Sequence, residues 1–194
     1  MKKIGIFGGT FNPIHLGHLI VAEEIRERMQ LDKILFIPSA RPPHKDSSKI
    51  INPIHRYKMT GLAIEDNPYF DISDIELKRA GKSYTIDTIR QLKNSIYGKH
   101  ELYLIIGGDS FLDINKWYKP EQIVRECHVI ATTRPGFDVS LVTPYWRRVI
   151  QFVPVSDIAI SATEIRNDVK SGVSIRYKVH PKVEEYIRNH NLYK

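Results

Sequence analysis

The sequence contains very little cysteine and no long apolar run. Its single cysteine, Cys127, allows no internal disulfide, so we expect a reducing, cytoplasmic location. Cys127 stands where a predicted helix runs into an apolar segment, which favours a packing role over a nucleophilic one. The apolar segments are short and separated by charged residues, so none is expected to span a membrane. The run that follows residues 1–3 is too brief for a secretory signal and suits a first strand instead.

The chain also lacks a continuous basic run, a nucleic-acid motif and a cluster of metal ligands. Its 29 lysine and arginine residues exceed its 22 acidic residues, and the net charge of +7 favours an anionic partner. Because the basic residues are scattered, most of them suit a solvated surface, and no nucleic-acid partner is expected. No set of His, Cys or carboxylate residues has the spacing of a closed metal site, so no protein-bound metal is predicted.

The 194 residues, 42% of them hydrophobic, are enough for one sizeable core, and no repeat, low-complexity tract or linker divides them. We therefore predict one domain over residues 1–194. Short apolar runs predict buried strands at residues 4–7, 34–37, 102–106, 129–131 and 149–153, with a weaker candidate at 70–75. Helical periodicity lies between them, at residues 19–29, 52–66, 85–96, 120–126 and 161–170, and again from 181. This alternation predicts an α/β fold, a Rossmann-like doubly wound parallel sheet with helices on both faces.

The periodicity also assigns caps and inward faces to some of these helices. A helix capped by Asn52 is expected to turn one side inward, formed by Ile54, Tyr57, Gly61 and Ile64. Thr85 is expected to cap the next helix, which would bury residues as far as Ile96. Residues 39–51, rich in Pro, Lys and Ser, have no usable periodicity and are expected to form a mobile loop of the kind that acts as a lid. Residues 137–145 are expected to be irregular.

Glycine-rich or polar turns follow four of the predicted strands, at residues 8–10, 42–45, 107–109 and 134–136. In a doubly wound sheet, ligands bind beyond the carboxyl ends of the strands. These four turns are therefore expected to converge on one crevice.

The stretch at residues 8–18 reads Gly-Gly-Thr-Phe-Asn-Pro-Ile-His-Leu-Gly-His and follows the first predicted strand. A glycine turn at the start of a helix presents backbone N–H groups and a positive helix end, which suits a phosphate. On their own, His15 and His18 could equally be hydrogen-bond donors to a phosphate or a pair of solvated or capping histidines. A zinc site is less favoured, because no third ligand with suitable spacing accompanies them.

With these residues assembled, the whole chain resembles the bacterial nicotinate mononucleotide adenylyltransferases, within the nucleotidyltransferase superfamily that has an H-x-G-H signature. The motifs that carry the resemblance lie at residues 8–18, 42–45 (Pro-Pro-His-Lys), 83–88 (Ser-Tyr-Thr-Ile-Asp-Thr), 106–109 (Ile-Gly-Gly-Asp), 117–118 (Trp-Tyr), 134–136 (Arg-Pro-Gly) and 160–166 (Ile-Ser-Ala-Thr-Glu-Ile-Arg). Class I aminoacyl-tRNA synthetases share a related His-Gly-His element, but they are much longer and their Lys-Met-Ser-Lys-Ser motif is absent here. Asn12, where many relatives have Asp, is a mild departure that affects no catalytic role.

The resemblance implies adenylyl transfer in NAD biosynthesis. The 5′-phosphate of nicotinate mononucleotide would attack the α-phosphorus of ATP, giving nicotinate adenine dinucleotide and pyrophosphate. Because a phosphate monoester has its second pKa near about 6, this nucleophile is mostly ionised at neutral pH and needs no general base. The remaining work is to align two anions and to neutralise charge on the transferring and leaving phosphates.

The resemblance also implies roles for individual residues. The catalytic set is His15, His18 and Arg166. The residues expected to bind ATP are Gly8, Gly9, Thr10, Phe11, His15, His18, Gly107, Asp109, Ser161, Thr163 and Arg166. Those expected to bind nicotinate mononucleotide are Lys45, Thr85, Trp117, Tyr118 and Arg134. Mg²⁺ is expected to accompany ATP through its phosphates and waters, without a dedicated protein site.

Structural alternatives exist for several of these residues. Ser161 and Glu164 have the spacing of a capping box, a role that is compatible with an anion site at the same helix start. Asp109 could serve only as a helix N-cap. Arg134 and Lys45 could be ordinary surface cations.

Two other functions are alternatives to adenylyl transfer to nicotinate mononucleotide. One is another transferase of the superfamily, acting on nicotinamide mononucleotide, pantetheine phosphate or a cytidylyl donor, against which the Trp117-Tyr118 and 83–88 elements argue. The other is a nonenzymatic nucleotide sensor or RNA-binding module, suggested only by the net charge.

A pocket that offers only donors would favour the nicotinate carboxylate over the nicotinamide amide. Homo-oligomerisation is left open by the sequence.

Overall fold

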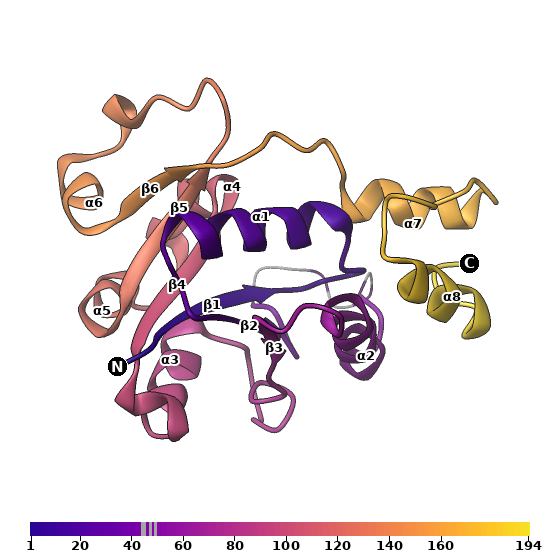
Figure 1. Cartoon of the computed structure of the whole chain (residues 1–194), viewed down its shortest axis with the longest axis horizontal. Coiled ribbons are helices and arrows are strands. Elements are labelled where there is room, and N and C mark those ends of the chain that lie inside the picture. The colour runs from indigo at the N-terminus through magenta and orange to yellow at the C-terminus, as the bar shows by residue number, and fades with distance from the viewer. Residues whose placement is uncertain (44–45, 47, 49) are drawn as a thin grey trace.

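The computed structural model describes residues 1–43, 46, 48 and 50–194. For Asp109 it describes the backbone but not the side chain. The centre of the structure is a six-stranded parallel sheet in the order β3-β2-β1-β4-β5-β6 (Figure 1). The strands are β1 (Lys3–Gly9), β2 (Lys33–Pro38), β3 (Phe70–Ile72), β4 (Glu101–Gly107), β5 (His128–Thr133) and β6 (Gln151–Pro154). This order, in which the direction of winding reverses beside β1, confirms the predicted Rossmann-like doubly wound sheet.

Helices cover both faces of the sheet. The α-helices are α1 (Leu16–Arg28), α2 (Pro53–Ile64), α3 (Thr85–Lys93), α4 (Gly108–Leu112), α5 (Pro120–Glu126), α6 (Pro144–Val149), α7 (Ala162–Lys170) and α8 (Pro181–Asn189). Short 3-10 helices are η2 (Ile96–Lys99), η3 (Ile114–Lys116) and η4 (Val139–Leu141). One hydrophobic cluster joins the sheet to α1, α2, α7 and α8, and a second joins the opposite face to α3, α4, α5 and α6.

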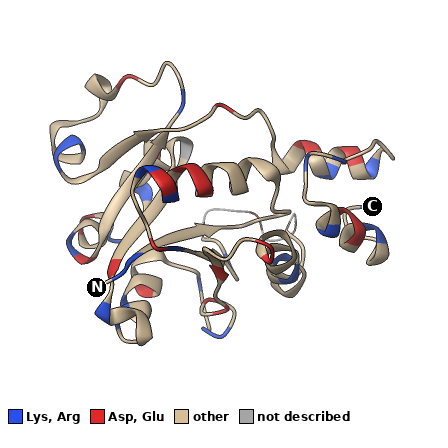
Figure 2. Ribbon diagram, in the orientation of Figure 1, with Lys and Arg blue, Asp and Glu red and all other residues tan. Residues whose placement is uncertain are grey.

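The alternation of side chains along β1 shows why two cores form. Ile4 and Ile6 belong to one cluster, whereas Phe7 belongs to the other. Successive side chains of a strand point to opposite faces, so an apolar strand buried on both sides supplies both cores. No helix within the described residues has the length and apolar character needed to cross a membrane. Lys and Arg are interspersed with Asp and Glu over several helices (Figure 2).

The predicted inward face of α2 is wrong at Ile54 and right at Ile64. Its Asn52 cap is confirmed, because the Asn52 side chain accepts a hydrogen bond of 2.9 Å from Ile54 N. However, Ile54 is 54% exposed, and the buried positions are Arg56, Met59, Thr60, Ala63 and Ile64. The helix is therefore rotated relative to the prediction, because a buried arginine takes a place that an apolar pattern does not reveal.

Other elements also differ in detail from the sequence-based expectations. Tyr84, and not Thr85, is the N-cap of α3, and Ile96 is 75% exposed in η2 beyond the end of α3. The final strand begins at Gln151, since α6 continues to Val149. Residues 137–145 are irregular only in part, because η4 and the start of α6 fall among them. The expected lid at 39–51 includes His44, Lys45, Ser47 and Lys49, which lie outside the described residues.

The last two helices of the chain lie beyond the carboxyl end of β1 (Figure 1). In Figure 1, α7 and α8 lie at the end of the molecule toward which β1 points, with α8 beside α2. The backbone closes this arrangement directly, because Leu16 N donates a hydrogen bond of 2.9 Å to Lys178 O. The glycine turn between β1 and α1 is thus enclosed by segments from both ends of the chain.

Candidate active site

A cleft of about 1340 Å³ opens at the carboxyl ends of the strands. Its walls come from the ends of β1, β2, β4 and β5 and from the start of α7. The predicted site residues that line it are Gly8, Gly9, Thr10, Phe11, His15, His18, Thr85, Gly107, Trp117, Tyr118, Arg134, Ser161, Thr163 and Arg166. The predicted convergence on one crevice is therefore confirmed for these residues, whereas Lys45 and the side chain of Asp109 lie outside the described residues.

The glycine turn brings backbone close to the cleft. A side chain at Gly8 would meet no atom within 4 Å, so this position leaves open space beside the backbone. A Cβ on Gly9 would lie only 2.7 Å from the ring of Phe11, whose φ of 44° is left-handed. Gly9 thus allows the Phe11 ring to fold back under the turn, where it meets His18 edge-on at a centroid distance of 5.1 Å.

The two histidines form a stacked pair at the start of α1. Their ring centroids are 3.6 Å apart with an interplanar angle of 27°. The backbone N–H of His15 donates a hydrogen bond of 3.2 Å to Nδ1 of His18. An accepting Nδ1 carries no proton, so the proton of neutral His18 is on Nε2. The backbone therefore sets His18 as an Nε2–H donor at the wall of the cleft.

His15 lies behind His18 and is only 8% exposed. Burial lowers the pKa of His15 to about 4, so its ring is neutral at physiological pH. Its Nδ1 is buried and makes no hydrogen bond within the described part of the chain. Gly17 leaves room for this ring, because a Cβ there would lie 3.1 Å from Nδ1 of His15. The glycine between the histidines thus lets the His15 ring stack on His18 without a tight contact to a side chain at position 17.

Helix α7 brings a cap and a cation to the same side of the cleft. Ser161 is its N-cap and accepts a hydrogen bond of 3.1 Å from Glu164 N, as the predicted capping box requires. The Glu164 carboxylate does not complete the box and instead pairs with Lys178 Nζ at 2.6 Å. Arg166 donates through Nη1 to Asn12 O at 2.8 Å and through Nη2 to Thr163 Oγ1 at 3.1 Å. The fork of Arg166 is therefore fixed against the turn that carries the histidines.

The opposite wall carries aromatic side chains and the start of α3. The rings of Tyr84 and Tyr118 lie 4.6 Å apart, and Lys119 Nζ stands 4.9 Å from the centroid of the Tyr118 ring. Trp117 follows η3 and is half-buried. Thr85 is the first residue of α3, so its N–H is among those that helix geometry leaves without an intrahelical acceptor. This wall combines a flat apolar surface with backbone donors.

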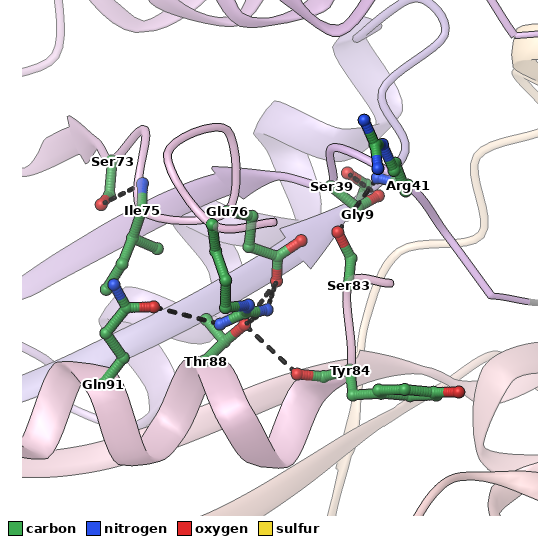
Figure 3. A network of polar contacts seen from close by, with 11 residues as sticks. Gly9, Ser39, Arg41, Ser73, Ile75, Glu76, Ser83, Tyr84, Thr88 and Gln91 are labelled. Carbon is green, nitrogen blue, oxygen red and sulfur yellow. Dashed lines mark hydrogen bonds and ion pairs between the residues drawn. The ribbon is translucent and has the colours of Figure 1, made fainter. Parts of the chain in front are cut away.

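A buried carboxylate supports this wall from behind. Glu76 is 7% exposed and accepts a hydrogen bond of 2.6 Å from Thr88 Oγ1, which in turn accepts one of 2.9 Å from Arg79 Nη2. Figure 3 shows Glu76 between Thr88 of α3 and Ser83. Burial raises the pKa of Glu76, and the hydrogen bond from Thr88 acts in the opposite direction. The network fixes the turn from Ser83 to Thr85 against the sheet.

The remaining predicted residues lie at the ends of β4 and β5. Gly107 is the N-cap of α4, so the alternative in which Asp109 caps this helix is wrong; Asp109 stands within its first turn. Arg134 follows β5, lines the cleft and lies 3.7 Å from Asp157 through Nε.

Cys127 lies at the end of α5, away from this cleft, and burial raises the pKa of its thiol to about 12, as a packing role requires.

Three residues around the site have no role predicted from the sequence: Arg56, Asn12 and Tyr193. Asn12 accepts Arg166 on its backbone oxygen and the Tyr193 hydroxyl, at 3.1 Å, on Oδ1. Arg56 is buried beneath the glycine turn. Arg56 lies on the same helical face as the buried Met59, Thr60 and Ala63, but an apolar pattern does not mark an arginine as buried, and nothing local marks Tyr193.

The comparisons with known proteins agree on one family for this chain. Residues 6–168 match the cytidylyltransferase-like family. A "probable nicotinate-nucleotide adenylyltransferase" of Thermoanaerobacter sp. (strain X514) is 43% identical over 200 residues, covering 99% of this chain and 94% of the relative. One of the same name from Thermomicrobium roseum is 44% identical over 200 residues, covering 100% of this chain and 92% of the relative.

A solved structure agrees with the fold. The nicotinic acid mononucleotide adenylyltransferase of Plasmodium falciparum, complexed with NaAD, superposes with a TM-score of 0.80 at 22% identity, covering 100% of this chain and 98% of that one. At this identity the likeness shows the fold alone. The full-length relatives carry the family assignment, and they confirm the resemblance drawn from the motifs. The chain therefore belongs to the cytidylyltransferase-like family and, within it, to the nicotinate-nucleotide adenylyltransferases.

Proposed function

We propose that this protein transfers the adenylyl group of ATP to nicotinate mononucleotide, forming nicotinate adenine dinucleotide and pyrophosphate. The observation that carries the proposal is the convergence, in one cleft, of the His18 Nε2 donor, the glycine turn and the start of α7 with Arg166. The full-length relatives named as nicotinate-nucleotide adenylyltransferases support the same activity.

The chemistry of the reaction fits donors and cations better than a general base. The mononucleotide phosphate is mostly ionised at neutral pH, since its second pKa is about 6. His18 would donate to the α-phosphate as charge develops on it, and stacked, neutral His15 would hold that ring in place. Ser161, Thr163 and Arg166 would bind the β- and γ-phosphates at the positive end of α7. Catalysis in this account is positioning and charge stabilisation.

The aromatic wall is the proposed mononucleotide side. Trp117 would stack on the cationic pyridinium ring, and the backbone N–H groups of Thr85 and Tyr118 would donate to the nicotinate carboxylate. A nicotinamide amide would place its own NH₂ against these donors and leave them unsatisfied. Arg134 would bind the mononucleotide phosphate, and a phosphate role for Lys45 stays a prediction. Selectivity for the deamido substrate follows from a pocket of donors.

Metal ion and location complete the proposal. Among the described residues, no three His, Cys, Asp or Glu side chains gather into a metal site, so no step is assigned to a protein-bound metal. We propose that Mg²⁺ arrives with ATP, bound to its phosphates and to water. A cytoplasmic location is proposed because a chain with a single cysteine needs no oxidising compartment.

An acceptor panel tests the function. The purified protein is incubated with ATP and Mg²⁺, each candidate acceptor is added in turn, and pyrophosphate release is measured. We expect release with nicotinate mononucleotide at least about tenfold faster, in kcat/KM, than with nicotinamide mononucleotide, and background release with pantetheine phosphate. Background release with nicotinate mononucleotide would exclude the proposed reaction.

A further inference from the structure

Arg56 is a buried cation that the reaction, as proposed, does not use. It is 0% exposed and belongs to α2, one turn beyond the Asn52 cap. Burial lowers the pKa of Arg56 to about 10, so the guanidinium remains charged at neutral pH. A buried charge is costly unless strong acceptors surround it.

The acceptors of Arg56 are main-chain carbonyl oxygens from three separate segments. Nη1 donates to Thr10 O at 2.6 Å, in the turn that leads to the histidines. Nη2 donates to Ser39 O at 2.6 Å and to Ala40 O at 3.3 Å, just beyond β2. Nε donates to Ile51 O at 3.1 Å, immediately before α2. A single planar fork thus joins three pieces of backbone.

Residues 39–41, which we call the bridge segment, continue this connection across the cleft. Toward the glycine turn, Ser39 donates to Gly9 O through its N–H at 2.8 Å and through its hydroxyl at 3.1 Å. Toward the other wall, Arg41 N donates to Ser83 Oγ at 3.1 Å and Ser83 N donates to Arg41 O at 2.9 Å (Figure 3). Ser83 begins the turn that Glu76 and Thr88 support. The bridge segment therefore connects the glycine turn with the wall that carries Tyr84 and Thr85.

We propose that Arg56 is a positioning residue that fixes the separation between the two sides of the cleft, by holding the bridge segment against the glycine turn. This inference rests on the proposed function, in which ATP lies on one side and the mononucleotide on the other. In-line attack requires the two phosphates at one distance and angle, and a misplacement of about 1 Å can cost about a hundredfold in rate. Each substrate, in contrast, makes its contacts within its own side.

This arrangement predicts which ligands should respond to a change at Arg56. A ligand confined to one side should bind almost normally when the separation changes. A ligand that spans both sides, such as the dinucleotide product, should bind less well, because it cannot satisfy both sides at once. General destabilisation of the fold would instead weaken all ligands alike.

The test uses Arg56→Met and Arg56→Lys, with Lys58→Met as the matched control. Lys58 is exposed on the same helix. The lysine variant keeps the charge but cannot reach three segments with one ammonium group, and it keeps the test open if the methionine variant does not fold. Circular dichroism establishes folding, calorimetry gives Kd for α,β-methylene-ATP, nicotinate mononucleotide and nicotinate adenine dinucleotide, and steady-state assays give kcat and both KM values.

For each folded Arg56 variant we expect kcat to fall about a hundredfold, each KM and single-side Kd to change less than about threefold, and the dinucleotide Kd to rise about tenfold. Lys58→Met should match the wild type. Unchanged kcat in Arg56→Lys, or equal weakening of all three ligands, would overturn the inference. A wild-type protein that forms no dinucleotide would count against the proposed function instead, so the two failures are distinguishable.

Discussion

His15 illustrates at the residue scale how burial of an imidazole couples the site to pH. Its pKa in the fold is about 4, below the ordinary value of 6.5, because burial disfavours the charged ring. Between these values the unfolded chain binds a proton that the folded chain does not. The stability contributed by neutral His15 is therefore complete above pH 6.5 and is lost as the pH falls toward 4.

This linkage is measurable as a difference between two proteins. The free energy of unfolding, measured with urea, should depend more steeply on pH in the wild type than in His15→Gln. Between pH 7 and pH 4 the wild type should lose about 3 kcal/mol more than the variant, since one pKa unit corresponds to about 1.4 kcal/mol. A difference that does not vary with pH would show that His15 titrates normally in the fold.

Gly17 shows how a missing side chain shapes the same pair. An alanine Cβ there would stand 3.1 Å from His15 Nδ1 and 3.2 Å from Cε1, so the ring stacked on His18 would have to shift by a few tenths of an ångström. We expect Gly17→Ala to lower kcat about tenfold, because the His18 donor would be misplaced.

Gly61 provides the control for this substitution. It also lies within a helix, α2, and a Cβ there would meet nothing within 4 Å. Gly61→Ala should leave kcat unchanged and stabilise the protein by up to about 1 kcal/mol through helix propensity. If the two alanine variants had the same kcat, the steric role of Gly17 would be refuted.

At the scale of elements, the start of α3 depends on one hydroxyl. The Thr88 hydroxyl donates a hydrogen bond to Glu76 and accepts one from Arg79, and it also lies 3.3 Å from Tyr84 O. Thr88→Val keeps the shape but leaves the buried Glu76 carboxylate without this donor, at a cost of about 2 kcal/mol in unfolding free energy. The loss of this hydrogen bond should also loosen the turn from Ser83 to Thr85 that precedes α3.

The kinetic consequence should be confined to one substrate. In Thr88→Val the KM for nicotinate mononucleotide should rise several-fold while the KM for ATP stays the same, because the turn belongs to the proposed mononucleotide side. Thr88→Ser restores the hydroxyl and should recover both stability and KM. A rise in both KM values, or a serine variant as impaired as the valine one, would contradict this role.

Helix α2 shows what local patterns can and cannot predict about an element. Its cap and its starting proline follow from Asn52 and Pro53, and the sequence predicts them correctly, whereas the helix ends at Ile64, before the predicted end at residue 66. Its inward face does not follow from the apolar spacing, because the free energy that places Arg56 inside comes from carbonyl groups distant in sequence. The same limit applies to Ile96, whose apolar character does not prevent exposure once the helix ends at Lys93.

At the scale of the whole molecule, the fold follows from alternation and the crevice follows from parallel strands. Short apolar runs alternating with helices predict the doubly wound sheet, and the turns after its strands then meet at one edge. The packing of the carboxyl-terminal segment against the glycine turn, in contrast, could not be predicted from the sequence. Tyr193 reaches Asn12 and Lys178 O reaches Leu16 across more than half the sequence, and such contacts leave no period or motif to detect.

In the proposed reaction this cleft directs attack at the α-phosphorus of ATP, with His18 as a donor and without a general base. The most direct test follows the label from ATP carrying ³²P at either the α or the γ position, with Mg²⁺ and nicotinate mononucleotide, in the wild type and in His18→Ala. We expect α-label to enter the dinucleotide and γ-label to enter pyrophosphate, and we expect His18→Ala to do both several orders of magnitude more slowly while remaining folded. Transfer of γ-label to the mononucleotide, no labelled dinucleotide, or a His18→Ala protein of normal turnover would contradict the proposed reaction.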